Sequence, residues 1–562
     1  MKKRGKQTFV TAPMPEGETW VGRIIDSHAD ALAYALVALT ALMALLLFNV
    51  RLSEGGDDST YICRALDLVA EGRYPDFQGP LYPVFLAPFI LMGGGVSVVG
   101  LKFTSYALII FGQLAMYLSL RHVVSRRLLL SVMLLMASNL WFVQFGSLTY
   151  SEPLFIVVMW LFVWALLRLD GLSRLASWRH VALWGGLVGL FAVAAILVRT
   201  AGVGLVISAV VYLALRRKWR AVAVAVASSV LCFALWLGVR SAVWGEVKTD
   251  GRQLQTLLQV DPYDPADGME TPQGFVKRFI GNSDLYISKH YVKMLGLRDV
   301  DSRQTSRAAT VIVYALFLWG AWVASRKNRG VLLAAVLAAV MLGLTFCSLQ
   351  VIWDQYRLIL PYVALMHIVV LYAVADVARR LSRRHTLKIM ACAVGLCSAV
   401  LLSRAGGVMD LITLRKNLTT DLLAGYTPDW YNYLTLCREV GRQMPGDDVY
   451  VACRKPNMAR IYAGGKKFYG IYNIPSDDPD VLVKNLKEKG VTHVIVASLR
   501  RDPAQAGLGV INTIHRYAAA ILQRYPGFLE QVAIVGNEQN EPAALFKINY
   551  EVAAQATQTD KQ

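Results

Sequence analysis

Long apolar stretches recur along most of this chain, and short polar connections separate them. The first stretch, Ala31 to Val50, has about 20 residues, enough at about 1.5 Å per residue to cross a hydrocarbon core about 30 Å thick. It is too long for the core of a signal peptide, and no small-residue cleavage site follows it, so we expect an uncleaved anchor. The pattern predicts an α-helical polytopic membrane protein with about 11 transmembrane helices, the others at residues 97–120, 128–146, 151–168, 181–198, 201–215, 221–240, 309–325, 331–349, 358–377 and 386–403.

The composition agrees with this pattern. The chain of 562 residues is 55% hydrophobic and only 17% charged, which is rare in a soluble globular protein of this size. Its mean hydropathy is +0.43. The seven cysteines show no spacing typical of a zinc site. A disulfide between Cys437 and Cys453 is one option in an oxidising outer compartment.

Basic residues occur in every second connection between the predicted spans. By the positive-inside rule, these connections lie on the cytoplasmic side together with the N-terminal segment 1–30. The formal net charge of +19 then follows largely from topology, so the sequence does not favour a nucleic-acid partner. The basic residues are Lys2, Lys3, Arg4, Lys6, Arg121, Arg126, Arg127, Arg168, Arg174, Arg179, Arg216, Arg217, Lys218, Arg220, Arg326, Lys327, Arg329, Arg379, Arg380, Arg383 and Arg384.

The long polar segments fall on the outer side once this orientation is adopted. We expect a transmembrane domain at residues 31–403 with two long outer loops, 51–96 and 241–308. An odd number of spans places the C-terminal segment 404–562 outside as well. The predicted location is the inner (cytoplasmic) membrane, with a cytoplasmic N-terminus.

The C-terminal segment has the pattern of a small soluble domain. Two β-rich runs, residues 447–452 and 491–497, are separated by amphipathic stretches such as residues 478–489. This alternation predicts an extracytoplasmic α/β domain. A channel does not need such a domain, whereas an enzyme that handles a bulky acceptor could use one.

Two adjacent carboxylates, Asp57 and Asp58, follow the first predicted span. They precede a segment, residues 60–72, whose apolar residues recur at helical spacing, as in a helix lying on the bilayer surface. One of the two acids could cap this helix. A cap needs only one carboxylate, so the second acid is left for another role. Because charged groups are costly to bury, the pair indicates chemistry at the membrane surface.

Two further outer segments supply candidate substrate contacts. Residues 79–95 are apolar but interrupted by prolines, which favours a short re-entrant or interfacial helix along a cavity. Tyr82 in this segment is a candidate substrate-binding residue. Glu152 opens the fourth predicted span, where it either complements the helix dipole or adds a third acid to the outer face.

Basic and aromatic counterparts lie on the same predicted side. Arg199 occupies a short outer connection, against the usual charge bias, so we expect it to have an anionic partner. Tyr356 and Arg357 lie between the ninth and tenth spans, where Arg357 could bind a phosphate or pair with Asp354. His290 in the second long loop is either a hydrogen-bonding group for a phosphate or an ordinary interfacial residue.

Together, these motifs resemble the GT-C glycosyltransferases, and in particular the group that includes protein O-mannosyltransferases and the lipid A aminoarabinose transferase. The resemblance covers residues 31–403 and rests on the order and sidedness of the motifs. Aminoarabinose transferases have Lys-Pro-Pro-Leu where this chain has Gly79-Pro80-Leu81, which argues against lipid A aminoarabinose transfer. The closer relatives also usually have Asp-Glu where this chain has Asp-Asp. The motifs are Asp57-Asp58, Pro80-Leu81-Tyr82-Pro83, Ser151-Glu152-Pro153, Leu197-Val198-Arg199-Thr200-Ala201-Gly202 and Tyr356-Arg357-Leu358-Ile359-Leu360-Pro361.

The resemblance implies transfer of a hexosyl or pentosyl group from a polyprenyl-phosphate donor to a lipid, glycan or protein acceptor at the outer face of the bilayer. It places an acid of the first loop at the reacting centre, and we carry this role over to Asp58 first and Asp57 second, as general base. Attack from the face opposite the leaving group would invert the anomeric centre. Arg357, and Arg199 as second choice, would support the charge of the phosphate, while Glu152 would orient the acceptor or the arginines.

The sequence leaves two rival functions and the cofactor open. A transporter or flippase for lipid-linked glycans would also contain intramembrane charges and broken helices, but it predicts inverted repeats and small outer loops. A polymerase or ligase of another membrane family would use a large outer loop without needing the acidic pair. The sequence commits to no cofactor, although two or three carboxylates could hold the divalent metal that some GT-C enzymes use.

Overall fold

The computed structural model describes residues 20–76, 78–173, 176–245, 257–261, 267–298, 305–350, 352–446, 448–500, 511–537 and 541–559. The chain divides into two compact units, which are described separately. Unit 1 comprises Met1–Leu47, Ser105–Gly146 and Ser151–Met409, and unit 2 comprises Phe48–Thr104, Ser147–Tyr150 and Asp410–Gln562. Six residues named in the sequence predictions lie outside the described residues: Lys2, Lys3, Arg4, Lys6, Arg174 and Asp447.

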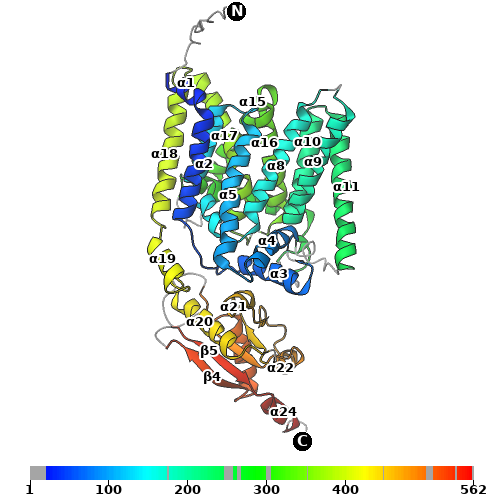
Figure 1. Cartoon of the computed structure of the whole chain (residues 1–562), viewed down its shortest axis with the longest axis vertical. Coiled ribbons are helices and arrows are strands. Elements are labelled where there is room, and N and C mark those ends of the chain that lie inside the picture. The colour runs from blue at the N-terminus through cyan, green and yellow to red at the C-terminus, as the bar shows by residue number, and fades with distance from the viewer. Residues whose placement is uncertain are drawn as a thin grey trace, which may run out of the picture. The chain divides into compact units, whose positions relative to one another are not determined.

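Unit 1 is a bundle of long apolar helices (Figure 1). The helices α8 and α17 form its centre, since 78% of the apolar window of each is buried, whereas only 11% of α11 and 17% of α18 is buried. The bounds are α1 (Trp20–Ser27), α2 (Ala29–Leu46), α5 (Val98–Leu120, which begins in unit 2), α6 (Arg126–Ser138), α7 (Leu140–Val143), α8 (Ser151–Gly171), α9 (Trp178–Val198), α10 (Val203–Leu215), α11 (Trp219–Trp244), α13 (Pro272–Ser283), the π-helix η4 (Asp284–Tyr291), α14 (Val292–Met294), α15 (Arg307–Lys327), α16 (Arg329–Ser348), α17 (Val363–Leu381) and α18 (Thr386–Gly406).

The predicted spans agree with these helices, with two local differences. Nine of the described helices are long and apolar enough to cross a membrane. The run predicted at 128–146 is divided at Asn139, where two helical pieces meet at an angle of 70°. The side chain of Asn139 accepts hydrogen bonds from the backbone of Trp141 and Phe142 and thereby starts a new helix. The run predicted at 201–215 forms a shorter apolar helix, Thr200–Leu215.

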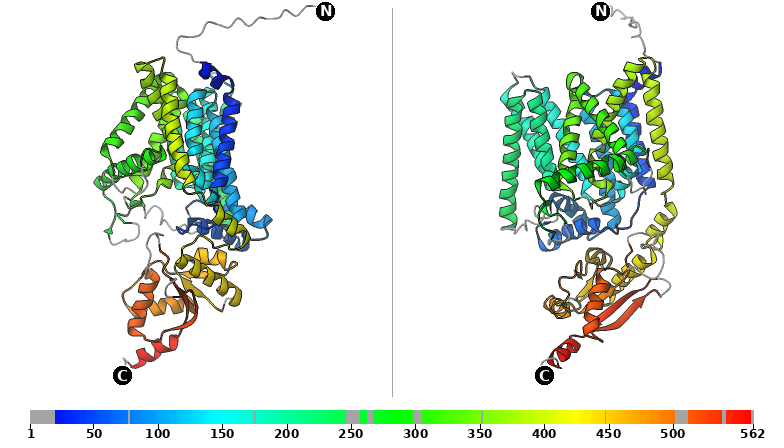
Figure 2. Two further views of the ribbon diagram at one scale, coloured as in Figure 1. Left: turned by 90° about the vertical axis from the view of Figure 1, so that its left-hand side faces the viewer. Right: turned by 180° about the vertical axis from the view of Figure 1, so that it is seen from behind.

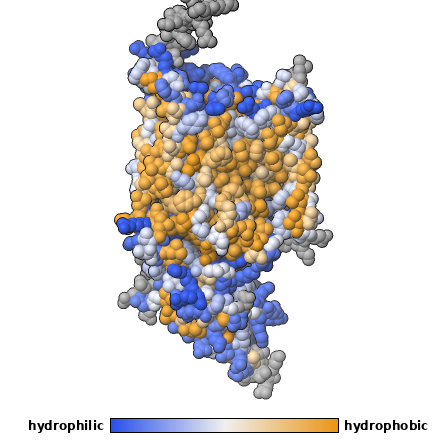
Figure 3. All heavy atoms as spheres, viewed as in Figure 1, coloured by the Kyte–Doolittle hydropathy of each residue, from blue (hydrophilic) through white to orange (hydrophobic). Residues whose placement is uncertain are grey.

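The basic connections of unit 1 gather at one end of the bundle. Those between α5 and α6, α8 and α9, α10 and α11, α15 and α16, and α17 and α18 lie at the upper end in Figure 1. Figure 3 shows this end as hydrophilic, above a broad apolar belt over the helices. The protein is therefore a multi-pass membrane protein. Which side of the membrane this end faces stays a prediction of the positive-inside rule.

Unit 2 combines the first long loop with the C-terminal segment. The loop forms the two helices α3 and α4, and the C-terminal segment forms helices and a five-stranded sheet of order β2-β1-β3-β5-β4 (Figure 2). The bounds are α3 (Asp57–Glu71), α4 (Leu81–Met92), α19 (Leu411–Thr419), α20 (Pro428–Gln443), β1 (Val451–Cys453), α21 (Pro456–Tyr462), β2 (Phe468–Gly470), α22 (Pro479–Glu488), β3 (His493–Val496), α23 (Thr513–Arg524), β4 (Leu529–Val535), β5 (Ala543–Ile548) and α24 (Tyr550–Thr559).

The sheet confirms the predicted α/β character of the C-terminal segment. Strand β1 pairs in parallel with β2 and β3, and β5 pairs antiparallel with β3 and β4. The two predicted β-rich runs become β1 and β3, and the predicted amphipathic stretch becomes α22. Buried Leu482 and Leu486 of α22 share one hydrophobic core with Val494 and Tyr517. The cysteines Cys437 and Cys453 are both buried and free, so the optional disulfide is absent from the structure.

Candidate active site

The acidic pair lies in the first turn of α3 in unit 2. The residue before it, Gly56, has the left-handed backbone conformation, with φ of 87°, which a glycine adopts without strain. Gly56 is the N-cap of α3 and has no side chain to offer, so the alternative in which Asp57 or Asp58 caps this helix is wrong. Both acids follow the cap, where the helix dipole favours negative charge.

Asp58 is completely buried and holds the preceding loop in place. Its two carboxylate oxygens accept hydrogen bonds from the backbone N–H of Ser53 at 2.7 Å, the hydroxyl of Ser53 at 3.1 Å and the backbone N–H of Ser59 at 2.8 Å. Burial raises the pKa of Asp58, and the nearby charge of Lys102 and these hydrogen bonds offset only part of that increase. Within unit 2, Asp58 therefore stabilises the loop before α3 through its hydrogen bonds with Ser53.

Asp57 differs from its neighbour in exposure. Its side chain is half-buried, whereas the side chain of Asp58 is 0% exposed. A general base must present a lone pair to the acceptor hydroxyl. Of the two acids, Asp57 meets this requirement better in the conformation that the structure describes.

Three residues that support Asp58 were not predicted from the sequence. Ser53 donates to Asp58, and its hydroxyl also lies 2.7 Å from the hydroxyl of Tyr150. Lys102 is fully buried near Asp58 and donates to the backbone carbonyl of Ser147. A signal for Lys102 was available, because it is a lone charge inside an apolar run. No comparable signal distinguishes Ser53 or Tyr150.

Tyr82 occupies the interior of unit 2. Its segment forms α4, a 12-residue helix with Pro88 inside it, as the interrupted apolar pattern predicted. The side chain of Tyr82 is fully buried, and its ring packs edge-on against Tyr61 of α3 at 4.9 Å between centroids. In this conformation Tyr82 joins α4 to α3, and its predicted contact with a substrate is untested.

In unit 1, Arg199 has the anionic partner that its position led us to expect. Its guanidinium Nη1 lies 2.6 Å from the carboxylate of Glu152 and donates to the hydroxyl of Ser151 at 3.2 Å. The side chain of Glu152 is only 2% exposed. The ion pair links the start of α8 to the end of α9. Orienting an arginine stays one of the two roles predicted for Glu152.

Tyr356 and Arg357 lie in the same electrostatic neighbourhood as Glu152. Burial raises the pKa of Tyr356, with Arg357 lowering it and Glu152 raising it further. The amide of Gln144 donates to the hydroxyl of Tyr356. Arg357 is half-buried, and its Nε donates to the side chain of Gln355 at 2.7 Å. The structure thus brings Glu152, Arg199, Tyr356 and Arg357 into one cluster.

His290 binds Asp354 rather than presenting a donor to a phosphate. Its Nε2 lies 2.7 Å from one carboxylate oxygen of Asp354, and the ammonium of Lys289 binds the other. Burial lowers the pKa of His290 to about 4, although Asp354 opposes this effect, so the imidazole is neutral at pH 7. Nε2 must carry the proton that Asp354 accepts, which leaves Nδ1 as an acceptor.

Asp354 is also the carboxylate that was proposed as a partner of Arg357. Burial raises the pKa of Asp354, but hydrogen bonds from Lys289 and His290 outweigh burial and leave that pKa lower than usual. The carboxylate is therefore already engaged by two bases of the π-helix η4.

Lys293 is a basic residue of this cluster that the sequence did not single out. Its side chain is 5% exposed, and its ammonium lies 4.7 Å from the ring centre of Trp141 and 5.4 Å from that of Tyr356. Such placement between aromatic faces stabilises a cation away from water. Together, Arg199, Lys293 and Arg357 make this part of unit 1 a cationic and aromatic cluster.

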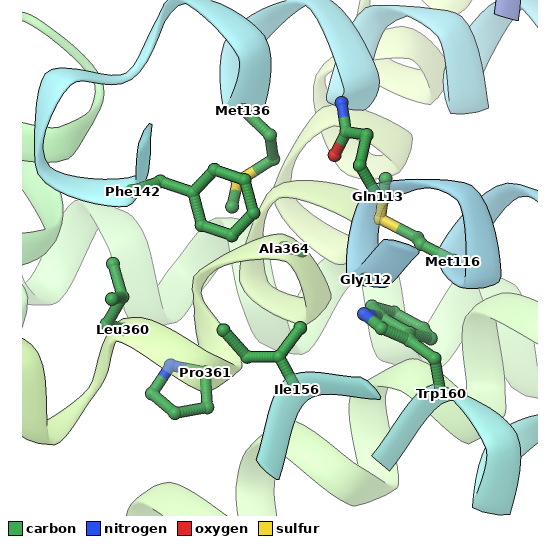
Figure 4. A pocket seen from close by; sticks show the side chains of 10 residues that line it. All are labelled: Gly112, Gln113, Met116, Met136, Phe142, Ile156, Trp160, Leu360, Pro361 and Ala364. Atoms are coloured by element: carbon green, nitrogen blue, oxygen red, sulfur yellow. The ribbon is translucent and has the colours of Figure 1, made fainter. Parts of the chain in front are cut away.

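A narrow apolar pocket in unit 1 contains no ionisable side chain among its described lining residues (Figure 4). Gln113 is the polar residue in its wall, and its amide donates to the backbone carbonyl of Met133 at 2.8 Å. The pocket suits hydrocarbon rather than polar chemistry. It is lined by Gly112, Gln113, Met116, Met136, Phe142, Ile156, Trp160, Leu360, Pro361 and Ala364.

Within the described part of the chain, no group of three or more His, Cys, Asp or Glu side chains is arranged to hold a metal ion. The divalent metal considered from the sequence therefore has no such ligand set among these residues.

The helix order and the C-terminal sheet define a multi-pass membrane protein with a small C-terminal α/β segment. The chain superposes on the crystal structure of ArnT from Cupriavidus metallidurans bound to undecaprenyl phosphate, with a TM-score of 0.56 and 12% identity over 92% of this chain and 98% of that chain. The apo structure of the same ArnT gives a TM-score of 0.53 and 12% identity over 93% and 99% of the two chains. No family model and no curated protein matches the sequence. At this level of identity, the similarity establishes the fold.

Proposed function

We propose that this protein is a membrane glycosyltransferase that moves a sugar from a polyprenyl-phosphate donor to an acceptor hydroxyl at the outer face of the cytoplasmic membrane. The observation that carries this proposal is the pair of carboxylates at the start of α3, in a fold shared with an ArnT that was crystallised with undecaprenyl phosphate. The sugar and the acceptor, whether lipid, glycan or protein, stay open.

In the proposed reaction, the acceptor oxygen forms a bond to the anomeric carbon while the bond from that carbon to the phosphate oxygen breaks. The acceptor proton passes to a carboxylate, and the polyprenyl phosphate leaves as an anion that needs no protonation. Attack opposite the leaving group inverts the anomeric centre. General-base catalysis of this kind contributes roughly 10²-fold to 10⁴-fold to the rate.

We assign the role of base to Asp57 and place Asp58 second, which reverses the order proposed from the sequence. All three hydrogen bonds described for Asp58 are directed to its own loop and helix, and its side chain is inaccessible. Asp57 follows the left-handed Gly56 and is half-buried. In this scheme, Asp58 fixes the loop and Asp57 receives the proton.

We assign phosphate binding to the cationic cluster of unit 1, with Arg357 and Lys293 as the principal residues. Arg199 is a weaker candidate, because Glu152 already neutralises much of its charge. A guanidinium and an ammonium stabilise a phosphate leaving group as its charge develops. His290 would act indirectly, through its hydrogen bond to Asp354.

Turnover by the purified protein in detergent tests this proposal. The wild type is offered a panel of polyprenyl-phosphate sugars with envelope lipids and glycans, and release of polyprenyl phosphate is measured. We expect D57N to lose at least roughly 100-fold in rate. D76N is the matched control, since Asp76 lies in the same loop and pairs with Arg64 while remaining half-exposed.

The outcomes separate the rival functions. Full activity in D57N would contradict the assignment of Asp57 as base, and full activity in both D57N and D58N would exclude a base in this pair. Absence of turnover with every donor, combined with movement of a lipid-linked glycan across vesicles, would establish a flippase or transporter. Extension of a lipid-linked glycan by whole repeat units would instead favour a polymerase or ligase.

A further inference from the structure

The loop that leads to the acidic pair is held by side chains from the C-terminal segment of unit 2. The hydroxyl of Tyr426 donates to the backbone carbonyl of Leu52 at 2.7 Å. The ammonium of Lys455 donates to two backbone carbonyls further along the loop, those of Glu54 at 2.8 Å and Gly55 at 3.2 Å. Three backbone carbonyls of the loop therefore accept hydrogen bonds from residues 374 to 401 positions later in the chain.

Lys455 is itself held firmly between β1 and α21. It is the N-cap residue of α21, and its own backbone carbonyl accepts a hydrogen bond from the hydroxyl of Tyr433 at 3.1 Å. Its ammonium also lies 5.9 Å from the ring centre of Trp430. A Cβ atom on Gly56 would lie 3.6 Å from this ammonium, so the loop passes close to it just before Asp57.

Further contacts continue along α3 away from the acids. Asn457 donates to the hydroxyl of Thr60 at 2.9 Å, and Arg460 binds Asp67 at 2.6 Å. At the far end, Lys467 binds Glu71. The C-terminal segment thus contacts α3 from its first turn to its last. Among the basic residues in these contacts, Lys455 is the one whose hydrogen bonds fall on the loop next to the acidic pair.

We propose that Lys455 is a positioning residue that sets the location of the Asp57 carboxylate, and that holding this loop is a function of the C-terminal α/β segment. The inference rests on the proposed function, because it assigns Asp57 a catalytic location. Two carbonyl groups that point at one centre repel each other unless a cation lies between them. Charge-assisted hydrogen bonds from one ammonium supply that attraction.

The rate should be sensitive to this contact. A displacement of about 1 Å at a reacting group can cost roughly 100-fold in rate. Loss of the ammonium frees residues 54 and 55 and lets the left-handed turn at Gly56 relax. The carboxylate of Asp57 then samples unproductive positions, while the donor-binding groups of unit 1 are unchanged. The effect should appear in kcat and leave KM for the donor unaltered.

Three variants test this inference: Lys455→Met, which keeps an unbranched stem of similar length without the charge; Lys455→Arg; and Lys467→Met as control. We expect K455M to lose roughly 100-fold in kcat with an unchanged KM for the donor. K455R should recover most of the rate, because a guanidinium can donate to both carbonyls. K467M removes an exposed ion pair at the other end of α3 and should retain wild-type rates. A wild-type kcat in K455M, or an equal loss in K467M, would overturn the inference.

Hydrogen exchange separates this inference from the proposed function. Amides in peptides covering residues 52–62 should exchange faster in K455M than in the wild type, and those of β1 and β3 should not change. If the wild type shows no turnover with any donor, the proposed function fails, yet the exchange experiment still tests the contact. Unchanged exchange in residues 52–62 would overturn the positioning role whatever the activity.

Discussion

The guanidinium of Arg199 and the carboxylate of Glu152 lie 2.6 Å apart, and the carboxylate is only 2% exposed. Neither charge is easy to bury alone, because an isolated ion loses its hydration. Each therefore depends on the other at the junction between α8 and α9. The ion pair with Glu152 explains why Arg199, a cation, occurs in a connection that is predicted to lie on the outer side.

Removal of one partner should destabilise unit 1. E152Q leaves Arg199 without its charge partner in a largely buried place, and we expect the free energy of unfolding to fall by about 3 kcal/mol. The double variant E152Q/R199Q should recover part of this loss, since it leaves no unpaired charge. Unfolding of the purified protein in detergent measures both effects. Equal stability of E152Q and the wild type would show that the pair contributes nothing.

The two acids of α3 should respond differently to the same substitution. D58N replaces one carboxylate oxygen by an NH2 group, which cannot accept a hydrogen bond. At least one contact from Ser53 is then lost, and we expect a loss of about 1–3 kcal/mol in the free energy of unfolding. D57N removes a charge that the helix dipole favours, so it should cost less stability than D58N, roughly 0.3–1 kcal/mol, and it should lose turnover. Thermal unfolding and initial rates on the same samples check this contrast. A D57N variant that unfolds early but retains its rate would contradict the division of roles.

The stability of unit 1 should depend on pH through His290. Its pKa is about 4 in the folded protein and near 6.5 when exposed, so only the unfolded chain takes up a proton between these values. Stability therefore falls as the pH drops from about 6.5 towards 4, by up to about 3 kcal/mol. H290Q should flatten this part of the profile, measured as the unfolding midpoint between pH 7.5 and 4.5. An identical slope in H290Q would assign the dependence to another group.

The cationic cluster of unit 1 should bind the phosphate rather than the lipid tail. We expect R357M and K293M each to weaken binding of undecaprenyl phosphate about tenfold, which corresponds to about 1.4 kcal/mol. Binding of the uncharged polyprenol should not change. K388M is the control, because Lys388 is an exposed lysine on α18. Binding is measured by native mass spectrometry, and equal loss for the alcohol and the phosphate would refute the assignment.

The sequence predicted the helices and the C-terminal sheet because their signals are local. A run of about 20 apolar residues identifies a span on its own, and alternating short runs identify a small α/β segment. The division at Asn139 is less visible, since one asparagine inside an apolar run is both a tolerated residue and a cap. The length of an apolar run therefore predicted that a helix forms better than it predicted where the helix is interrupted.

The candidate site was predicted in part, as individual residues without their partners. The position of Arg199 in a short outer connection predicted an anionic partner, but the sequence could not show that this partner is Glu152. The hydrogen bonds from Lys455 to Glu54 and Gly55 join residues about 400 positions apart, and no spacing rule covers such a distance. Capping of α3 was predicted wrongly because Gly56 takes a left-handed conformation and moves the helix start to Asp57.

The π-helix η4 explains how two neighbouring residues can share one carboxylate. In an α-helix, successive side chains diverge around the axis and rarely meet a common target. The wider turn of a π-helix, closed by bonds from each residue to the fifth along, splays successive side chains less. Lys289 and His290 both reach Asp354 from such a turn. Deletion of a single residue in η4 would restore α-helical winding and rotate Lys289 or His290 away from the carboxylate of Asp354. The extra residue of the π-helix therefore helps to set the electrostatic environment next to Arg357.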